Sequence, residues 1–214
     1  MNGPIQTQSL QLQQIAYYGQ YDAMRSRSIS PIVLAATLDI PAPTARLNAD
    51  WEREIALYLA LEPGDVAQLP LARARPRWPD FSQCVQAMTN WTCSLGLQDV
   101  LSTAAMALMA CRGARYHHDA EQYGGKAFCN LFLSEDKGLD LHFPQTGLLI
   151  PLIRGTAVVF DTGQTHAVIK RGSCDFDSDD FPQGSDCSLV FLTWELPIEN
   201  TSVAQALQIE FTPP

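Results

Sequence analysis

The sequence predicts an α+β protein whose first half is helical or mixed and whose second half is all β, folded as a sandwich or barrel. Two observations support this prediction. Before about residue 104, apolar residues recur at helical spacing between helix start and stop signals. After it, they form short runs bounded by Gly, Pro, Asp and Ser. We expect the two parts, 1–103 and 104–214, to form one structural unit, with the first packed on the second.

The first expected helix runs from Asn48 to Leu61. Asn48 is a residue type that caps helices, and acidic residues follow it in the first turn. Trp51 and Ile55 lie on the apolar face, and Pro63-Gly64 ends the pattern. The connector that follows, LPLARARPRWPD, is broken by proline.

The second expected helix starts at Asp80. Gln83 is placed to complete a capping box with it, and Gly96 closes the helix. A third, short helix is expected to start near Asp99.

The second half contains the strand candidates. Their lengths and their flanking turn residues are typical of a β-sandwich or barrel. In chain order they are AMALMAC, KAFCNLFLS, LDLHF, GLLIPLI, TAVVF, THAVI and SLVFLTWEL.

Composition excludes some functions. The 214 residues carry a net charge of -9, and an acidic protein lacks the basic face that nucleic acid requires. The longest apolar run, around Ala104–Ala110, is too short to cross a membrane, and the N-terminus lacks the pattern of a secretory signal. The six cysteines have no CxxC spacing, so we expect reduced thiols and a cytoplasmic protein.

The stretch RYHHD concentrates two of the four histidines beside an aspartate. If it is a regular strand, His117 and Asp119 point to one side and His118 to the other. A chelating pair of this kind needs a third ligand, and the remaining histidines are His142 and His166. His166 follows an apolar strand and a turn, and two histidines with one carboxylate form the facial triad of non-haem Fe(II) oxygenases.

Taken in order, the HxD motif of His117 and Asp119, GLDLHFPQTG, PLIRGTAVVF and His166 in THAV resemble the Fe(II)- and 2-oxoglutarate-dependent oxygenases. The order is most similar to the prolyl-hydroxylase-like branch, and the resemblance covers roughly residues 104–197. It implies a double-stranded β-helix (jelly-roll, cupin-like) core with an N-terminal helical elaboration. It also implies Fe(II) held by His117, Asp119 and His166, 2-oxoglutarate as co-substrate, and O₂-dependent oxidation of a small molecule.

The sequence departs from the family pattern at the base that holds the distal carboxylate of 2-oxoglutarate. The family usually places it near the start of the last core strand, but SLVFLTWEL contains no base. We favour Arg171, because its planar fork suits a carboxylate. The alternatives are Lys170, Arg154, Lys126 and Arg115. This departure keeps open a cupin-like metal-binding protein that does not use 2-oxoglutarate, such as an isomerase or a ligand-binding module.

Three further features have open interpretations. His118 and His142 are expected to be non-ligands, and Asn130 is either a satisfied buried amide or a polar group near the co-substrate. The acidic segment 172–186 is expected to be a solvated insertion. A lid that favours an amine-bearing substrate, such as an amino acid, is an alternative. A calcium loop is disfavoured because Asp180 stands where the turn of such a loop needs glycine.

Overall fold

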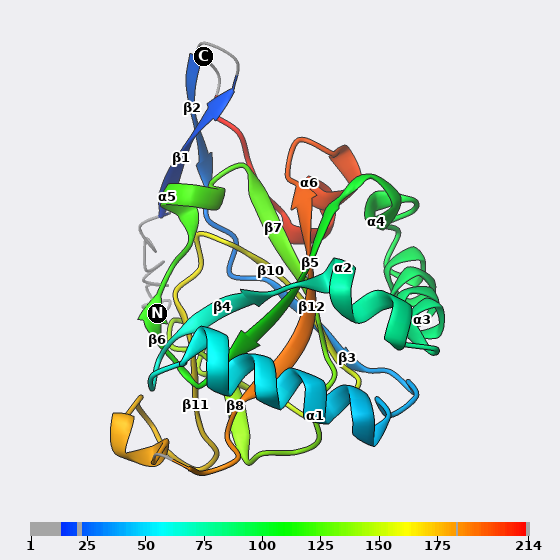
Figure 1. Cartoon of the computed structure of the whole chain (residues 1–214). Helices are drawn as coiled ribbons and strands as arrows, with labels where there is room; N and C mark the ends of the chain where they lie inside the picture. Colours follow the sequence, from blue (N-terminus) through cyan, green and yellow to red (C-terminus); the bar gives the residue numbers. More distant parts are fainter. Residues whose placement is uncertain (1–13, 21–22, 183, 213–214) are drawn as a thin grey trace, which may run out of the picture.

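The barrel of the protein is built from eight strands, four in each of two sheets (Figure 1). The computed structural model describes residues 14–20, 23–182 and 184–212. The eight strands are β5 (Ala105–Cys111), β6 (Ala114–His117), β7 (Lys126–Phe132), β8 (Leu139–Phe143), β9 (Leu148–Pro151), β10 (Thr156–Asp161), β11 (His166–Lys170) and β12 (Leu189–Pro197).

The pairing of these strands is that of a jelly roll. The larger sheet has the order β3-β10-β7-β12-β5-β4 and the smaller one β6-β11-β8-β9, with every pair antiparallel. The first strand of the eight pairs with the last, the second with the seventh, the third with the sixth and the fourth with the fifth. This is a long hairpin rolled into two sheets. The predicted double-stranded β-helix core is therefore confirmed.

The N-terminal part, which was expected to be a helical or mixed elaboration, contains strands as well as helices. Two of its strands, β3 and β4, are hydrogen-bonded to opposite edges of the larger sheet, and β1 and β2 form a separate hairpin. The strands are β1 (Ile15–Gln20), β2 (Ala23–Ser28), β3 (Val33–Thr37) and β4 (Val66–Leu69). The helices are α1 (Ala45–Glu54), the π-helix η1 (Ile55–Leu59), α2 (Leu71–Ala74), the 3₁₀ turn η2 (Arg75–Arg77), α3 (Phe81–Ser94) and α4 (Val100–Thr103).

Two helix starts differ from the predicted caps. Helix α1 begins three residues before Asn48, because Thr44 Oγ1 accepts a hydrogen bond from Leu47 N at 3.3 Å. Helix α3 does begin after Asp80, but Asp80 makes no side-chain cap. Its carboxylate instead accepts a hydrogen bond from the Gln83 side chain at 3.1 Å, so the capping box is not formed.

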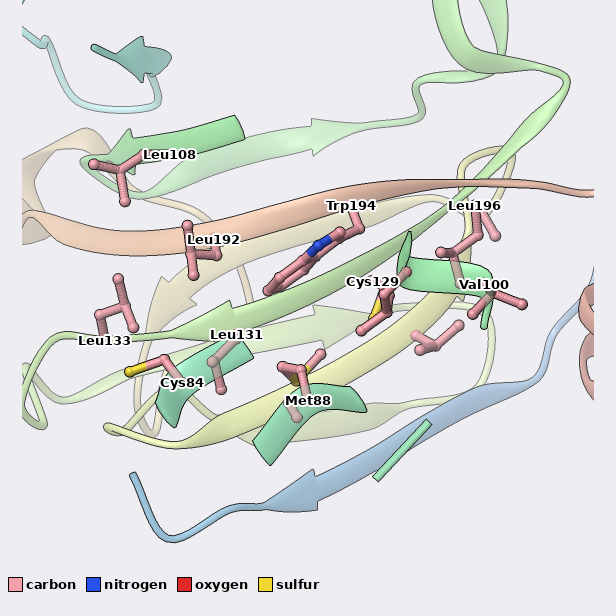
Figure 2. Close-up of a cluster of buried hydrophobic side chains, with 14 of the residues drawn as sticks. Cys84, Met88, Val100, Leu108, Cys129, Leu131, Leu133, Leu192, Trp194 and Leu196 are labelled. Atoms are coloured by element: carbon pink, nitrogen blue, oxygen red, sulfur yellow. The ribbon is translucent and has the colours of Figure 1, made fainter. Parts of the chain in front are cut away.

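The larger sheet has an apolar cluster on each face. On the helical side, Trp194 of β12 is 2% exposed and lies with Leu192 and Leu196 near Met88 of α3 (Figure 2). On the other side, Phe132 and Phe160 belong to the cluster between the two sheets. Full burial of a side chain of this size contributes about 1.5–3 kcal/mol. Both faces therefore stabilise the strands that carry the candidate site.

The remaining elements are short. They are α5 (Ala120–Tyr123), the 3₁₀ turn η3 (Ser178–Asp180) and α6 (Thr201–Leu207). Within the described residues, every helix is too short or too polar to cross a membrane. All six cysteines are free, as predicted.

Candidate metal centre

Strand pairing in the smaller sheet brings two histidines together. His117 ends β6, His166 begins β11, and the two are register partners. Their ring centroids lie 4.4 Å apart. Asp119 Oδ2 lies 3.7 Å from Nε2 of His117 and 3.6 Å from Nε2 of His166. All three ligand atoms lie within 4.8 Å of one another, and the described residues contain no second group of His, Cys, Asp or Glu arranged in this way.

A bulge in β6 determines which side chains face this group. The register shifts between the pairs His166–His117 and Val168–Ala114, so that two residues of β6 lie opposite one residue of β11. One of the two, Tyr116, bonds His142 Nδ1 at 2.6 Å. The other, Arg115, lies over the ring of Phe176. A regular strand would place Arg115 on the face of His117, but the strand is not regular, and His142 is occupied outside the group.

Two backbone carbonyls orient the imidazoles. His117 Nδ1 donates to Arg115 O at 2.6 Å, and His166 Nδ1 donates to Gln164 O at 2.9 Å. Since a carbonyl oxygen only accepts, Nδ1 carries the proton in each ring. In the neutral form of each ring, the lone pair is therefore on Nε2, on the side of Asp119, as a metal ligand requires.

Burial sets the charge of the group. It lowers the pKa of His166 to about 4, and the neighbouring His117 adds to this effect, so the ring is neutral near pH 7. Burial also raises the pKa of Asp119, while His117 and His118 oppose that shift. One carboxylate and two imidazoles are a donor set that fits a divalent transition metal.

The turn between β10 and β11 connects two of the three ligands. Thr162 O accepts a hydrogen bond from Asp119 N at 2.7 Å. Thr162 Oγ1 lies 2.8 Å from Tyr123 O, which ties the turn to α5 just beyond Asp119. Gln164, whose carbonyl orients His166, is fully buried in the same turn. The sequence analysis identified this turn only as the segment before His166 and assigned no role to its residues. One feature of the sequence could have indicated the importance of the turn: Asp161 is an acidic residue directly after the apolar run TAVVF.

The inner face of the larger sheet lies beside the group. Because Leu192, Trp194 and Leu196 point to the helices, the alternate side chains of β12 point inward. Four of the inward side chains of β7 and β12 carry polar or charged groups. They are Lys126, Asn130, Thr193 and Glu195.

Asn130 is 7% exposed, and its Oδ1 has no hydrogen-bond partner. The register pairs it with Thr193 across the sheet. Phe160 and Phe143, whose ring centroids lie 4.8 and 6.1 Å from that of His166, make the ligand's surroundings apolar.

The basic residues considered for the co-substrate carboxylate differ in their contacts. Arg171 donates to Asp136 at 2.8 and 3.0 Å and to Asp140 at 2.8 Å, so its fork already faces two carboxylates. Lys170 pairs with Asp180 at 2.9 Å, and Arg154 lies 3.7 Å from Glu135. Within the described residues, Lys126 has no ion-pair partner, and it opens β7 on the inner face.

The acidic insertion begins at the end of β11 that lies away from His166. Phe181, 1% exposed, packs against Gly113, where a Cβ atom would lie 2.5 Å from its ring. Asp177 caps the turn η3 through Asp179 N. These contacts tie the insertion to the β5–β6 turn and do not support the lid interpretation. A groove of about 1040 Å³ near this end, lined by Trp51, Arg112 and Phe181 among others, includes none of the three ligands.

Comparisons with known proteins give remote matches. No protein-family model and no curated protein matches the chain. Among solved structures, the 2OG complex of the viral collagen prolyl hydroxylase vCPH from Paramecium Bursaria Chlorella virus-1 matches with 7% identity over 77% of this chain and 94% of that chain, at a TM-score of 0.45. A prolyl-4-hydroxylase from Pseudomonas putida matches with 16% identity, coverages of 77% and 92%, and a TM-score of 0.44. AviO1 from Streptomyces viridochromogenes matches with 13% identity, coverages of 79% and 90%, and a TM-score of 0.40.

Proposed function

We propose that the chain is a non-haem Fe(II)- and 2-oxoglutarate-dependent dioxygenase that oxidises a small molecule and releases succinate and CO₂. One observation carries this proposal: Nε2 of His117, Nε2 of His166 and a carboxylate oxygen of Asp119 converge at one end of a jelly roll. Two histidines and one carboxylate, with the remaining positions free for a chelating co-substrate and O₂, are the ligand set of this enzyme class.

The bound metal and co-substrate would supply the O₂ activation that oxidation of an unactivated C–H bond requires. The residues of the chain have simpler tasks. The carbonyls of Arg115 and Gln164 keep both imidazoles in the ligating tautomer. Phe143 and Phe160 keep water away from His166.

For the distal carboxylate of 2-oxoglutarate, we propose Lys126 in preference to Arg171. Lys126 lies on the inner face and has no protein carboxylate to displace among the described residues, whereas Arg171 faces Asp136 and Asp140. Lys126→Met should weaken 2-oxoglutarate binding, and Arg171→Gln should leave it unchanged. The opposite result would return the role to Arg171.

The proposed substrate is a small molecule with a cationic group, such as an amino acid. Glu195 supports this choice. It lies inward on β12, beside Phe128 in the register, and has no ion-pair partner among the described residues. Its charge raises the pKa of Tyr123, as does that of Asp119, after the larger effect of burial, so Tyr123 lies near both carboxylates.

A cupin-like metal-binding protein that does not use 2-oxoglutarate is the second candidate function. The observation that favours it is that the interior of the barrel beyond Asn130 is apolar. Beyond Asn130, the inward positions of β7 and β12 are Phe132 and Phe191, which stack at 5.1 Å and offer no base.

One titration separates these candidates. Metal-free protein receives Fe(II) without oxygen and is titrated with 2-oxoglutarate, and the visible charge-transfer band of the chelate is measured. We expect a band that disappears in His117→Ala and His166→Ala and persists in the control His118→Ala. Metal binding without a band would leave the cupin-like function. Failure to bind metal would refute both.

A further inference from the structure

A buried arginine of the N-terminal hairpin contacts the segments that follow and precede the metal ligands. Arg27 of β2 is 0% exposed. Its Nε donates to Gly124 O at 2.8 Å, on the segment that follows Asp119. Its two terminal nitrogens donate to the two carboxylate oxygens of Asp161 at 2.6 and 2.7 Å, at the start of the turn that precedes His166. All three guanidinium nitrogens therefore contact ligand-bearing segments.

Asp161 collects further bonds in the same place. It is 0% exposed, and its carboxylate also accepts hydrogen bonds from Ser30 N and Gly163 N, each at 2.8 Å. Its backbone oxygen accepts from Gln164 N at 2.9 Å. The carboxylate thus holds the turn on one side and the hairpin on the other.

From this ion pair, one short path of hydrogen bonds leads to each of two ligands. Asp161 is followed by Thr162, whose carbonyl accepts from Asp119 N. Asp161 also bonds Gln164 N, and Gln164 O accepts from His166 Nδ1. A single residue therefore connects the Arg27–Asp161 pair to each ligand: Thr162 to the backbone of Asp119, and Gln164 to the ring of His166.

The hairpin is seated directly on this region. Figure 1 shows β1 and β2 at one end of the barrel, beside α5. A Cβ atom on Gly124 would lie 2.6 Å from Tyr17 O, so only glycine allows the close approach of β1. Tyr18 covers Gly125 from the same strand.

We propose that Arg27 and Asp161 are positioning residues of the metal centre. The buried pair fixes turn 161–164 and Gly124, thereby holds Asp119 and His166 in the ligating arrangement, and makes the β1–β2 hairpin a part of the metal site. The proposal rests on the proposed function only in taking His117, Asp119 and His166 as metal ligands. Outer partners that orient ligands typically change metal affinity 10–100-fold when they are removed.

The test uses Arg27→Lys, which keeps the positive charge. A single ammonium cannot reproduce the planar contacts to Gly124 O and both oxygens of Asp161. The control is Leu47→Ala in α1, a buried position away from the turn, which also lowers stability. Asp161→Asn serves as the second variant if Arg27→Lys does not fold. Co(II) binding is followed by its visible absorption, and amide exchange is measured on the metal-free proteins.

We expect Arg27→Lys to bind Co(II) 10–100-fold more weakly than the wild type, with an altered absorption spectrum, and Leu47→Ala to bind within twofold of it. In metal-free Arg27→Lys, the amides of Asp119 and Gln164 should exchange faster than in Leu47→Ala at equal global stability. Equal Co(II) affinity and equal exchange in the two variants would show that the pair only stabilises the fold. If the wild type binds no Co(II), the proposed function fails, and the exchange measurement still decides whether the pair holds the turn.

Discussion

At the scale of single residues, most polar groups of the site have hydrogen-bond partners, and the side-chain oxygens of Asn130 and Gln164 do not. Each ligand histidine has its Nδ1 bonded to a carbonyl oxygen, and Asp119 N is bonded to Thr162 O. Asn130 differs, because its Oδ1 is buried on the inner face without a partner. A buried polar atom without a partner costs about 1–3 kcal/mol, so a residue that keeps one has another use.

Asn130→Leu should therefore make the metal-free protein more stable and less able to bind its co-substrate. We expect the free energy of unfolding to rise by about 1 kcal/mol, since an unpaired amide is replaced by an apolar group of similar size. Urea denaturation measures the first effect, and the anaerobic 2-oxoglutarate titration measures the second.

Thr92→Val is the matched control for this substitution. The Thr92 hydroxyl is buried and donates to Thr89 O at 3.1 Å, so its removal should lower the free energy of unfolding. If Asn130→Leu also lowers it, the amide is satisfied in solution and has no special role.

At the scale of elements, the bulge in β6 turns His117 toward Asp119. Two residues, Arg115 and Tyr116, share the place opposite one residue of β11. Deletion of Arg115 would restore regular pairing and, by the two-residue period of a strand, move one of the ligands off the inner face.

We expect the Arg115 deletion to abolish Co(II) binding while the protein remains folded. Arg115→Ala, which keeps the residue count, should bind Co(II) like the wild type. Circular dichroism checks the fold, and visible absorption checks the metal. Metal binding by the deletion variant would show that the bulge is not what orients His117.

The acidic insertion provides a second prediction at this scale. Phe181 is buried against the β5–β6 turn, at the opposite end of β11 from His166. Phe181→Ala should lower the free energy of unfolding by about 3–5 kcal/mol through the cavity it leaves. Co(II) affinity should not change. A weaker affinity, measured on protein shown to be folded, would mean that the insertion acts on the metal centre.

The barrel strands were predictable because their sequence patterns are local. The features that the sequence did not predict depend on contacts between residues far apart in the chain. Strands such as TAVVF have the length, apolar content and flanking turns of buried strands. By contrast, AMRSRS has no apolar alternation, and its inward residue Arg27 is matched by Asp161, 134 residues away. Likewise, Thr44 and Asn48 are both acceptable caps, and only the Thr44–Leu47 bond selects the first.

In the candidate site, too, the features that depend on local sequence were predictable and those that depend on distant contacts were not. His117 and Asp119 are close in sequence, so an extended backbone brings them together, and His166 was identified by its place after a strand and a turn. The bulge at Arg115 and the pairing of Arg171 with Asp136 could not be read from the sequence, because each depends on where another strand or loop lies.

At the scale of the whole molecule, the three ligands come from segments on both sides of the β6–β11 pairing, at one edge of the smaller sheet. Metal bound to His117, Asp119 and His166 therefore links β6 to β11 and is lost when the sheet opens. A ligand that binds only the folded protein raises its stability by mass action.

We expect Co(II) at one hundred times its dissociation constant to raise the free energy of unfolding by about 2.7 kcal/mol. A chelator should remove the increase, and His166→Ala should show none. Urea denaturation with and without metal measures it. An equal increase in His166→Ala would place the bound ion elsewhere on the protein.

The backbone bonds of β2 have a consequence for biosynthesis. Ser28 N donates to Glu210 O at 2.8 Å, and Thr212 N donates to Ser26 O at 3.1 Å, so the strand that carries Arg27 is completed by a segment made far later. Until residues 210–212 are made, β2 lacks this neighbour, although His117, Asp119 and His166 are already present in the nascent chain. We therefore expect tight binding of the metal to begin only after residues 210–212 have been made and have joined β2.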